Sequence, residues 1–581
     1  GPRSPGEVTS MSVSSLPFLH GALAAVLPKL AAWRRDFHAH PEAGWTEFRT
    51  AALIIRRLRE LGYAIRMGEA ACASDRRMGV PSSAVLAAAR ERALEHGADA
   101  ELVAGMGDGY TGFWADLDCG PGPVTAFRFD MDCNEVAECA EESHRPVREG
   151  FASRWPGLMH ACGHDGHAAV GLGLAEVLVS IRRHLRGRIR LIFQPAEEGA
   201  RGALPMSEAG AVDGVDVLFG FHIGFKAEGP GSLICGTQGF LATTKRDVLF
   251  SGVPAHAGAA PEEGKDALLA ACSAVVNLHA ISRNGKGGTR IAVGRLEGGE
   301  ARNVIPASAR LFMETRGETT ELDAYMTAES ERILRASADL WGCACEWRTV
   351  GNSAGGGSSP ELARLIATVA EAMGGWKTVI PMSGFGATED FACLMSRVQA
   401  SGGLASYLQV GTDRAAGHHS DRFDFDETCL GRALELLARL AVRMAGGGQE
   451  DTETETESDM EFLDEVVRRK GIHVQLWLEG EDGEGFGRGR VELLQLVDEL
   501  GSLSKAAKQL GMSYRGAWGK IKKAERIAGE TLVDASGTKR DGYSLTPAGR
   551  ELVQRFQQWY ADVESFAKKR AEALFSDFDK E

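Results

Sequence analysis

Hydrophobic and polar positions follow two periods along the first three quarters of the chain. From about Ser15 to Ala445, segments with helical spacing alternate with short apolar runs such as Ile189–Phe193 and Val215–Phe219. Alternating helices and strands are typical of an α/β domain with a mixed or parallel sheet. We therefore predict that residues 15–236 and 351–445 form one α/β domain.

The pattern changes within residues 237–350. Three runs alternate with a period of two residues, and they flank one helical stretch, Asp266–Ile281. The three runs are Lys245–Ser251, Arg290–Gly294 and Ala309–Thr315. This mixture predicts a small α+β domain inserted into the first domain. The Gly/Ser-rich stretch Asn352–Ser359 is expected to return the chain to its parent domain.

An acidic run separates this part of the chain from a basic C-terminal part. Residues 446–462 begin with three glycines and continue with glutamate, aspartate and threonine, which predicts a solvated linker. The net charge of −15 argues against a protein that coats nucleic acid or an anionic membrane along its whole length. Between Gly501 and Phe575, however, fourteen Lys/Arg and eight Asp/Glu leave a net charge of plus six.

The sequence predicts a cytoplasmic protein with no membrane partner. No stretch is long and apolar enough to span a bilayer. The apolar segment Leu16–Trp33 contains Pro17 and Pro28 and has no basic segment before it, so an amphipathic helix is favoured over a signal peptide. The 11 cysteines have no framework spacing, which favours reduced thiols. Residues 1–14 are expected to be a flexible leader.

Candidate metal ligands gather at a few short motifs. His160–His167 reads HACGHDGH, in which Cys162 and His164 can face one ion. Further on, Gln194–Glu198 and His222 end apolar runs, where open α/β sheets place their sites, and the doublet His418-His419 lies in a polar loop. A single histidine is more often structural than a ligand. Thiol, imidazole and carboxylate groups in this combination instead predict a divalent metal site.

The adjacent glutamates Glu197 and Glu198 suggest a division of labour. One carboxylate can bind a metal ion while its neighbour takes a proton from a water whose pKa the metal lowers. A carboxylate pair that served only as a charged surface would not normally end a buried apolar strand.

These motifs together resemble one family over residues 30 to 440. The motifs are FHAHPE at Phe37–Glu42, DMD at Asp130–Asp132, HACGHDGH at His160–His167, QPAEE at Gln194–Glu198, GFHI at Gly220–Ile223 and HHS at His418–Ser420. The set is similar to the zinc-peptidase-like amidohydrolases, which include hippurate, indole-acetyl-amino-acid and aminobenzoyl-glutamate hydrolases. The resemblance implies a metal-dependent amidohydrolase that cleaves the amide bond of N-acyl amino acids.

The resemblance also assigns roles to particular residues. Two Mn²⁺ or Zn²⁺ ions would be held by Cys162, His164, Glu198, His222 and His419, and Glu197 would be the general base. His418 is the alternative to His419, because the doublet leaves the register open. Asp132, His40 and Asp165 would either orient the ligands or serve a plain structural role.

The inserted domain resembles the lid and dimerisation domain of that family, which implies a homodimer. His256 would reach a neighbouring active site and stabilise the oxyanion. Asn303 and Arg316 match positions that hold the substrate carboxylate, a role that suits a planar guanidinium. The alternative for Arg316 is a solvated strand residue.

Two features narrow the resemblance within the family. The long region Gly68–Gly112, and Ser143–Pro146 after the DMD motif, resemble the A-subunit type of aminobenzoyl-glutamate hydrolase. The chain departs from the family at Cys133-Asn134, where Ala-Leu is common. This departure changes the rim of the site and leaves the exact substrate open, but it removes no ligand.

The C-terminal residues 463–575 predict a winged helix-turn-helix. Ser502–Ser513 reads as a capped helix, a glycine turn and a second serine cap, and the following helix, Tyr514–Ile527, is basic. Leu532–Leu545 reads as a two-stranded wing, and Thr546-Pro547 starts a long helix. The candidate DNA contacts are Ser513, Tyr514, Arg515, Lys520, Lys523, Lys539 and Arg540.

This region resembles the DNA-binding domain of molybdate-dependent transcriptional regulators, through GSLSKAAK and SYRGAW. The resemblance implies DNA binding without molybdate sensing. In the last helix, apolar residues step by four and three positions, which supports a dimer seam. These residues are Leu552, Phe556, Trp559, Val563 and Phe566. The alternative is that this helix packs on its own domain.

Three functions remain open from the sequence. The favoured one is an amidohydrolase fused to a DNA-binding domain. In the second, the chain is a ligand-responsive transcriptional regulator that uses the amidohydrolase-like domain as its sensor. Intact candidate ligands and an intact general base argue against this, because sensing does not require Glu197. In the third, the C-terminal domain only drives dimerisation.

Overall fold

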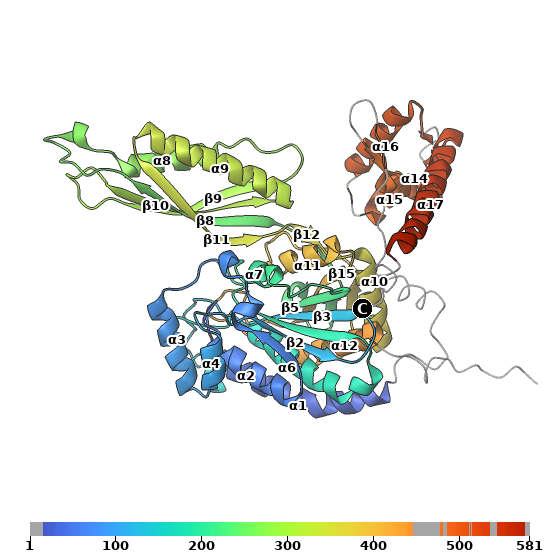
Figure 1. Cartoon of the computed structure of the whole chain (residues 1–581), viewed down its shortest axis with the longest axis horizontal. Helices are drawn as coiled ribbons and strands as arrows, with labels where there is room; N and C mark the ends of the chain where they lie inside the picture. Colours follow the sequence, from blue (N-terminus) through green and yellow to red (C-terminus); the bar gives the residue numbers. More distant parts are fainter. Residues whose placement is uncertain are drawn as a thin grey trace, which may run out of the picture. The chain divides into compact units, whose positions relative to one another are not determined.

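The computed structural model describes residues 16–445, 477–479, 485–510, 512, 514–534 and 543–575. The described residues fall into two compact units, residues 16–445 and residues 477–575 (Figure 1). The predicted leader 1–14 and linker 446–462 lie outside the described residues. None of the described helices combines the length and the hydropathy that a membrane span requires.

The first unit is built on an eight-stranded mixed sheet, as the sequence predicts. In spatial order its strands are β1 Ala64–Met67, β2 Phe113–Asp118, β4 Arg188–Gln194, β3 Val124–Asp130, β5 Val217–Glu228, β15 Leu404–Thr412, β6 Ser232–Ile234 and β13 Thr378–Ile380. The central pairs β4–β3, β3–β5 and β5–β15 are parallel, so the carboxyl ends of these strands meet at one edge. The pairs β1–β2 and β2–β4 are antiparallel.

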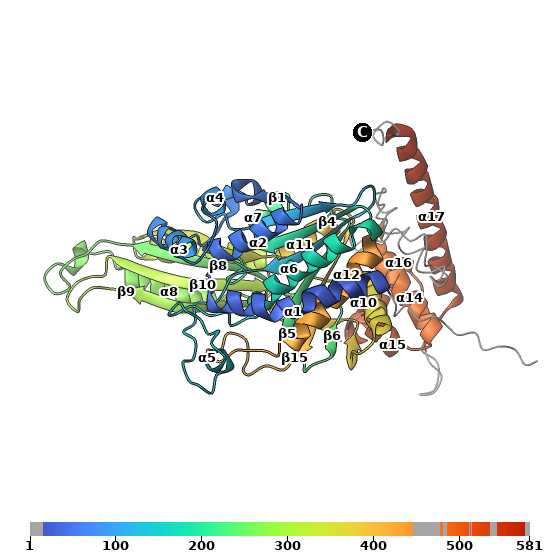
Figure 2. The same ribbon diagram turned by 90° about the horizontal axis from the view of Figure 1, so that it is seen from below.

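Helices cover both faces of this sheet and bury two apolar cores. Phe127 and Phe129 of β3 belong to the larger core, whereas Ala126, one position before Phe127, belongs to the smaller one. This alternation follows from the two-residue period of a strand. The larger core is covered by α1 Pro17–Ala39, α2 Phe48–Glu60, α6 His164–Ser180, α10 Pro360–Met373 and α12 Thr428–Ala445, and the smaller one by α7 Ala203–Glu208 and α11 Phe391–Ala400 (Figure 1 and Figure 2).

Shorter elements complete the unit. The helices are α3 Ser83–Glu95, α4 Ala100–Gly105 and α5 Arg145–Arg148, with single turns η1 Gly68–Ala71, η2 Ser74–Arg76, η3 Arg182–His184 and η4 Pro261–Glu263. A three-stranded sheet joins β12 Gly356–Gly357, β7 Thr237–Phe240 and β14 Ser383–Gly384 at the base of the inserted segment.

The inserted segment is an α+β unit. Its antiparallel sheet has the order β11 Ala344–Ser353, β8 Ala242–Ser251, β10 Ser308–Gly317 and β9 Thr289–Gly298. Two helices, α8 Ala267–His279 and α9 Thr320–Leu340, pack on one face through a third apolar core. The three predicted runs lie in β8, β9 and β10. Asp266 caps α8 by accepting a hydrogen bond from the backbone of Leu269 at 2.9 Å. The sequence patterns did not single out α9.

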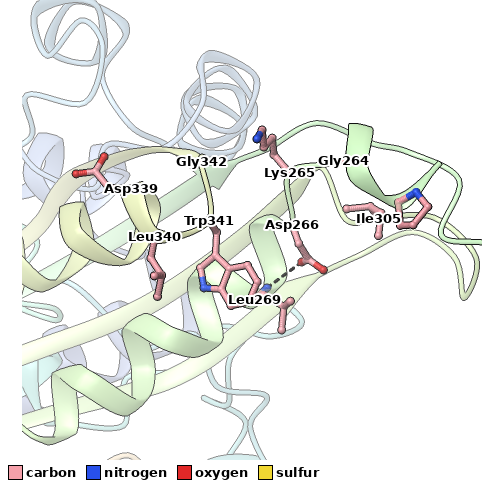
Figure 3. A pocket seen from close by; sticks show the side chains of 10 residues that line it. Gly264, Lys265, Asp266, Leu269, Ile305, Asp339, Leu340, Trp341 and Gly342 are labelled. Carbon is pink, nitrogen blue, oxygen red and sulfur yellow. Dashed lines mark hydrogen bonds between the residues drawn. The ribbon is translucent and has the colours of Figure 1, made fainter.

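A shallow pocket lies at the far end of this inserted unit (Figure 3). Its walls include Lys265, the capping residue Asp266, and Trp341 after α9. None of the groups of candidate metal ligands found among the described residues lines it. The pocket therefore lies at the capped start of α8, away from the candidate metal ligands.

The second unit is a small helical domain with its own core. Its helices are α14 Arg488–Leu500, α15 Leu503–Gln509, α16 Tyr514–Ala528 and α17 Pro547–Phe575, and its paired strands are β16 Trp477–Glu479 with β17 Gly485–Gly487 and β18 Val533–Asp534 with β19 Ser544–Leu545. Ser502 accepts a hydrogen bond from the backbone of Lys505, and Thr546 accepts one from Gly549, as expected of caps.

Helix α17 only partly agrees with a dimer seam. Phe556 is buried in the domain's own core and contacts Phe486, whereas Phe566 is 69% exposed. The first part of the helix therefore follows the alternative, in which it packs on its own domain. The exposed apolar residue, Phe566, lies towards the C-terminal end of the helix.

Candidate functional site

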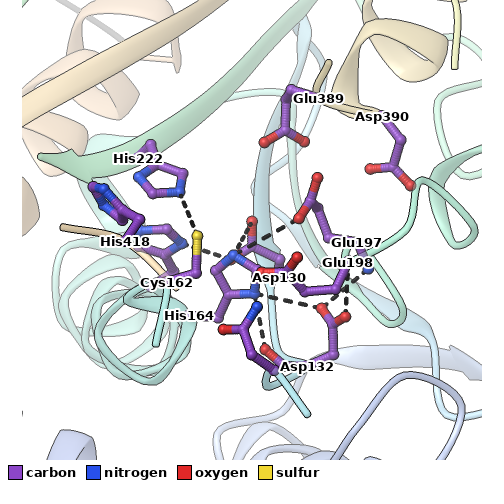
Figure 4. A network of polar contacts seen from close by, with 12 residues as sticks. Asp130, Asp132, Cys162, His164, Glu197, Glu198, His222, Glu389, Asp390 and His418 are labelled. Carbon is purple, nitrogen blue, oxygen red and sulfur yellow. Dashed lines mark hydrogen bonds and ion pairs between the residues drawn. The ribbon is translucent and has the colours of Figure 1, made fainter. Parts of the chain in front are cut away.

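The candidate ligands converge at the carboxyl edge of the central parallel strands (Figure 4). Asp130 ends β3 opposite Gln194, the last residue of β4, and the glutamate pair follows three residues later. His222 lies in the neighbouring strand β5. Gly163, with a φ of 95°, precedes α6, so that His164 starts this helix next to Cys162.

Cys162, His164 and His222 form one group of possible ligands. Their ligand atoms lie within 4.8 Å of one another, and Cys162 Sγ is 3.5 Å from His222 Nε2. The Nδ1 atoms of both histidines bond to backbone carbonyl oxygens, that of Asp132 for His164 and that of Ile223 for His222. His164 Nε2 is buried and has no hydrogen-bond partner. An orphaned imidazole nitrogen beside a thiol fits a metal cation.

Two further groups share members with the first. Cys162, Glu198 and His419 form one, and His164, Glu197 and Glu198 form the other. Glu198 Oε1 lies 3.3 Å from His419 Nε2. All five predicted ligands and the predicted base therefore come together, although they are drawn from strand ends, a helix start and a distant loop.

The histidine doublet divides between two roles. His419 faces Glu198, and its backbone N–H donates to Ala161 O at 2.7 Å, which holds the residue at a φ of 66°. His418 instead contacts the carbonyl oxygen of Ile223 at 3.2 Å and Arg414 at 2.9 Å. The geometry therefore favours His419 as the ligand.

Asp132 holds the glutamate turn. Its carboxylate accepts hydrogen bonds from the backbone N–H groups of Glu197, at 3.0 Å, and Glu198, at 2.9 Å. The other two residues considered for orienting ligands lie in different contacts. Asp165 accepts from Arg34 and lies 2.8 Å from His38 Nδ1, and His40 bonds to a backbone carbonyl. Their contacts fit the structural alternative.

A buried charge network under the site was not anticipated from the sequence. Arg128, which is 1% exposed, donates to Asp130 at 2.5 Å, to Glu389 at 3.0 Å and to Asp390 at 3.3 Å. Asp130 also contacts His167 Nδ1, and Tyr407 donates to Glu389 at 2.6 Å. Asp130 and His167 lie within quoted motifs, but Glu389 and Asp390 follow about 190 residues after Glu197 with no spacing signal.

The surroundings shift the pKa values of the site residues in different directions. Burial, together with the charges of Glu389 and Glu198, raises the pKa of Glu197 well above its usual range. Burial opposes the ionisation of Glu198 as well, but the hydrogen bond from His419 and the charge of His164 lower its pKa to about 2. Burial also lowers the pKa of His222, which keeps the imidazole neutral, the form that binds metals.

The three residues predicted in the inserted unit lie apart from this cluster. His256 and Asn303 meet in loops beyond the ends of the lid strands, where Ala257 N donates to Asn303 O at 2.9 Å. Neither residue has a hydrogen bond or ion pair with the candidate ligands among the described residues. Arg316 lies on β10 and donates to Glu314 at 2.8 Å. Among the described residues, then, none of the three forms a hydrogen bond or an ion pair with a candidate metal ligand.

The comparisons with known proteins agree with this geometry. Residues 126–443 match the model of Peptidase family M20/M25/M40. The chain belongs to the M20 family. It is 44% identical over 429 residues to indole-3-acetyl-aspartic acid hydrolase of Enterobacter agglomerans, covering 74% of this chain and 98% of the relative. It is 46% identical over 420 residues to a chain of the p-aminobenzoyl-glutamate hydrolase of Escherichia coli, covering 72% and 96%. The chain is thus an M20 amidohydrolase by its closely similar relatives.

A solved structure supports the fold of the M20 unit. The crystal structure of the aminobenzoyl-glutamate utilization protein from Klebsiella pneumoniae superposes with a TM-score of 0.63 and 39% sequence identity, covering 73% of this chain and 98% of that chain.

The second unit matches a DNA-binding family. Residues 489–550 match the model of the bacterial regulatory helix-turn-helix protein, lysR family. This is a different description from the molybdate-dependent regulators that the sequence motifs resembled, so the match supports a helix-turn-helix but not that particular type. The helices α15 and α16 lie inside the matched residues.

The predicted DNA contacts fall into three groups. Tyr514, Arg515 and Lys520 are exposed on α16. Lys523 is half-buried on the same helix. The others, Ser513, Lys539 and Arg540, lie outside the described residues.

The two histidines of the doublet can be distinguished by metal binding. We expect His419→Ala to weaken metal binding by at least the roughly 10- to 100-fold that loss of a supporting group costs. His418→Ala, the matched control, should retain the metal. Metal per chain after dialysis, measured by mass spectrometry, checks this; loss in His418→Ala alone would reverse the assignment.

The Arg128 network can be tested by stability. Arg128→Met leaves three buried carboxylates without their cation, so we expect the free energy of unfolding of the first unit to fall by about 3–5 kcal/mol. The control is Arg348→Gln, which breaks an exposed pair with Asp247 and should cost less than about 1 kcal/mol. Urea unfolding followed by near-UV circular dichroism measures both; equal effects would contradict the prediction.

Proposed function

We propose that this M20 member is a two-metal amidohydrolase that cleaves N-acyl amino acids and is tethered to a DNA-binding domain. One observation carries the proposal: overlapping groups of ligands share Cys162 and Glu198 and lie beside the carboxylate of Glu197. Shared ligands suit two ions at neighbouring positions, Mn²⁺ or Zn²⁺. Cys162, His164, Glu198, His222 and His419 would hold them.

The bound ions would polarise the scissile carbonyl and lower the pKa of the attacking water. Glu197 takes the proton from that water and delivers it to the leaving amine. Asp132 fixes the direction of this carboxylate, because it accepts hydrogen bonds from the N–H groups of Glu197 and Glu198, on either side of the Glu197 Cα. Burial raises the pKa of Glu197, which favours its return of the proton to the amine.

The substrate we propose is an N-acyl derivative of an acidic amino acid. By their names, the two relatives described above act on an acyl aspartate and an acyl glutamate. The high identity over nearly the whole length of both relatives supports the same class for this chain. Aminobenzoyl-glutamate is the first candidate.

The inserted unit would act as a lid and dimerisation domain. His256 and Asn303 lie beyond the strand ends and have no contact with the ligands of their own chain, so they would act in the active site of a partner protomer. There His256 would stabilise the oxyanion, and Asn303 would help to hold the substrate carboxylate. Arg316 would bind that carboxylate from the chain that carries the metal ligands.

The second unit would bind DNA as a winged helix-turn-helix. The exposed residues Tyr514, Arg515 and Lys520 of α16 suit contacts with bases and phosphates in a major groove. The short pair β18–β19 suits the base of a wing, and Ser513, Lys523, Lys539 and Arg540 complete the proposed contacts. The exposed Phe566 of α17 would contribute to a dimer.

The second candidate function is a ligand-responsive regulator whose M20 unit serves as a sensor. The helix-turn-helix in the same chain favours it. If ligand binding and DNA binding are coupled, each must change the affinity of the other by the same factor.

Hydrolysis of a small panel separates the two candidates. The metal-loaded protein should hydrolyse at least one of aminobenzoyl-glutamate, hippurate and several N-acetyl amino acids. Glu197→Gln should retain metal but lose about 10²- to 10⁴-fold in kcat, because it removes the general base. Glu371→Gln, at an exposed position of α10, is the matched control. Absence of turnover on the whole panel with metal bound would favour the sensor.

DNA binding can be tested separately. Arg515→Ala with Lys520→Ala should weaken retention of a duplex and reduce the slope of log K against log salt by about 2, since two phosphate contacts are lost. Arg555→Ala on α17 is the control. Light scattering checks that assembly size is unchanged; unaltered retention would instead leave this domain with a dimerisation role only.

A further inference from the structure

Lys245 lies on β8 at the base of the lid sheet, on the face that carries no helix. Burial alternates along β8: Arg246, Val248 and Phe250 are buried, whereas Lys245 and Asp247 are half-exposed. Val248 and Phe250 belong to the core under α8 and α9. Because side chains alternate between the two faces of a strand, Lys245 projects from the opposite face.

That face is turned towards the catalytic glutamate turn. Gly351 of β11 is the register partner of Lys245, so any side chain at Gly351 would point to the same face. A Cβ atom placed on Gly351 would lie 2.1 Å from the carbonyl oxygen of Gly199 and 3.2 Å from Lys245 Cδ. Gly199 directly follows Glu198. The stem of Lys245 therefore crosses the point where the lid backbone touches the turn.

A hydrogen bond fixes this approach. The backbone N–H of Asn352 donates to the carbonyl oxygen of Ala200 at 2.8 Å. Together with the close approach of Gly351 to Gly199, this bond places the stem of Lys245 next to the residues that follow Glu198.

The acidic neighbours of Lys245 on this face already have other partners. Glu314 lies directly across from Lys245 on β10, but its carboxylate accepts from Arg316 at 2.8 Å. Asp247, two residues along β8, pairs with Arg348 at 2.8 Å. Among the described residues, Lys245 itself has no ion pair with a carboxylate.

We propose that Lys245 binds the side-chain carboxylate of the substrate and so selects N-acyl aspartate or glutamate over uncharged amino acids. This inference rests on the proposed hydrolase function. Arg316 lies on the same face, diagonal to Lys245 across the β8–β10 pair, a spacing of roughly 7–8 Å between Cα atoms. Two long cationic side chains that start from neighbouring positions on one face can reach the two carboxylates of a dicarboxylic amino acid, with Arg316 taking the one on the α-carbon.

The matched substrates aminobenzoyl-glutamate and aminobenzoyl-glutamine test this directly, because they differ only in one charged group. The wild-type chain should prefer the glutamate compound in kcat/KM. Lys245→Met should lower kcat/KM for the glutamate compound by about 10- to 100-fold, the value of one charge-assisted hydrogen bond, and change that for glutamine little. Lys245→Arg should restore most of the preference.

Arg310→Met is the matched control, since Arg310 is an exposed cation further along the same face. Its glutamate-to-glutamine ratio should equal that of the wild type. Turnover of the glutamine compound by Lys245→Met shows that the variant is folded and active. An unchanged ratio in Lys245→Met, or a wild type without preference, would overturn the role of Lys245. A wild type that hydrolyses neither compound would instead overturn the proposed function, and this inference with it.

Discussion

The carboxyl edge of the central strands in the M20 unit depends on one buried guanidinium group. Arg128 neutralises Asp130, Glu389 and Asp390, which are almost completely excluded from solvent. Without a cation, carboxylates so close together could not all stay ionised away from water, because desolvation and mutual repulsion both favour protonation. The arrangement joins the end of β3 to the segment before α11, far apart in the chain. It therefore supports the edge from which His164, Glu197 and Glu198 project.

The ends of strands and the start of one helix determine where most of the candidate ligands lie. Cys162 and His164 precede and begin α6, His222 lies in β5, and the glutamates follow β4. Regular elements thus place a thiol, two imidazoles and two carboxylates around one point. Backbone carbonyls orient His164 and His222, and the carboxylate of Asp132 orients the glutamate turn. His419 comes from a loop far along the chain, and its backbone bond to Ala161 compensates for that freedom.

Local patterns in the sequence predicted the features that depend on neighbouring residues in the chain. The runs at Ile189 and Lys245, the helical stretch that begins at Asp266 and the ligand motifs all depend on periodicity or on short-range spacing, and the structure contains them. The Arg128 network depends instead on which strands become neighbours, and no period in the sequence encodes the pairing of Arg128 with Glu389 across 261 positions. The choice between His418 and His419 likewise required the tertiary contact with Glu198. The burial of Phe556 in its own domain depended on which helices pack around it.

The contact between Asn352 and Ala200 has a mechanical meaning. The peptide hydrogen bond from Asn352 to Ala200 joins the end of β11 to the residues that follow Glu197 and Glu198. Glycines stand on both sides of it, Gly351 and Gly199, so no side chain separates the two backbones. A rotation of the inserted unit would therefore pull on the short loop that carries Glu197, and the inserted unit and the glutamate turn would move together.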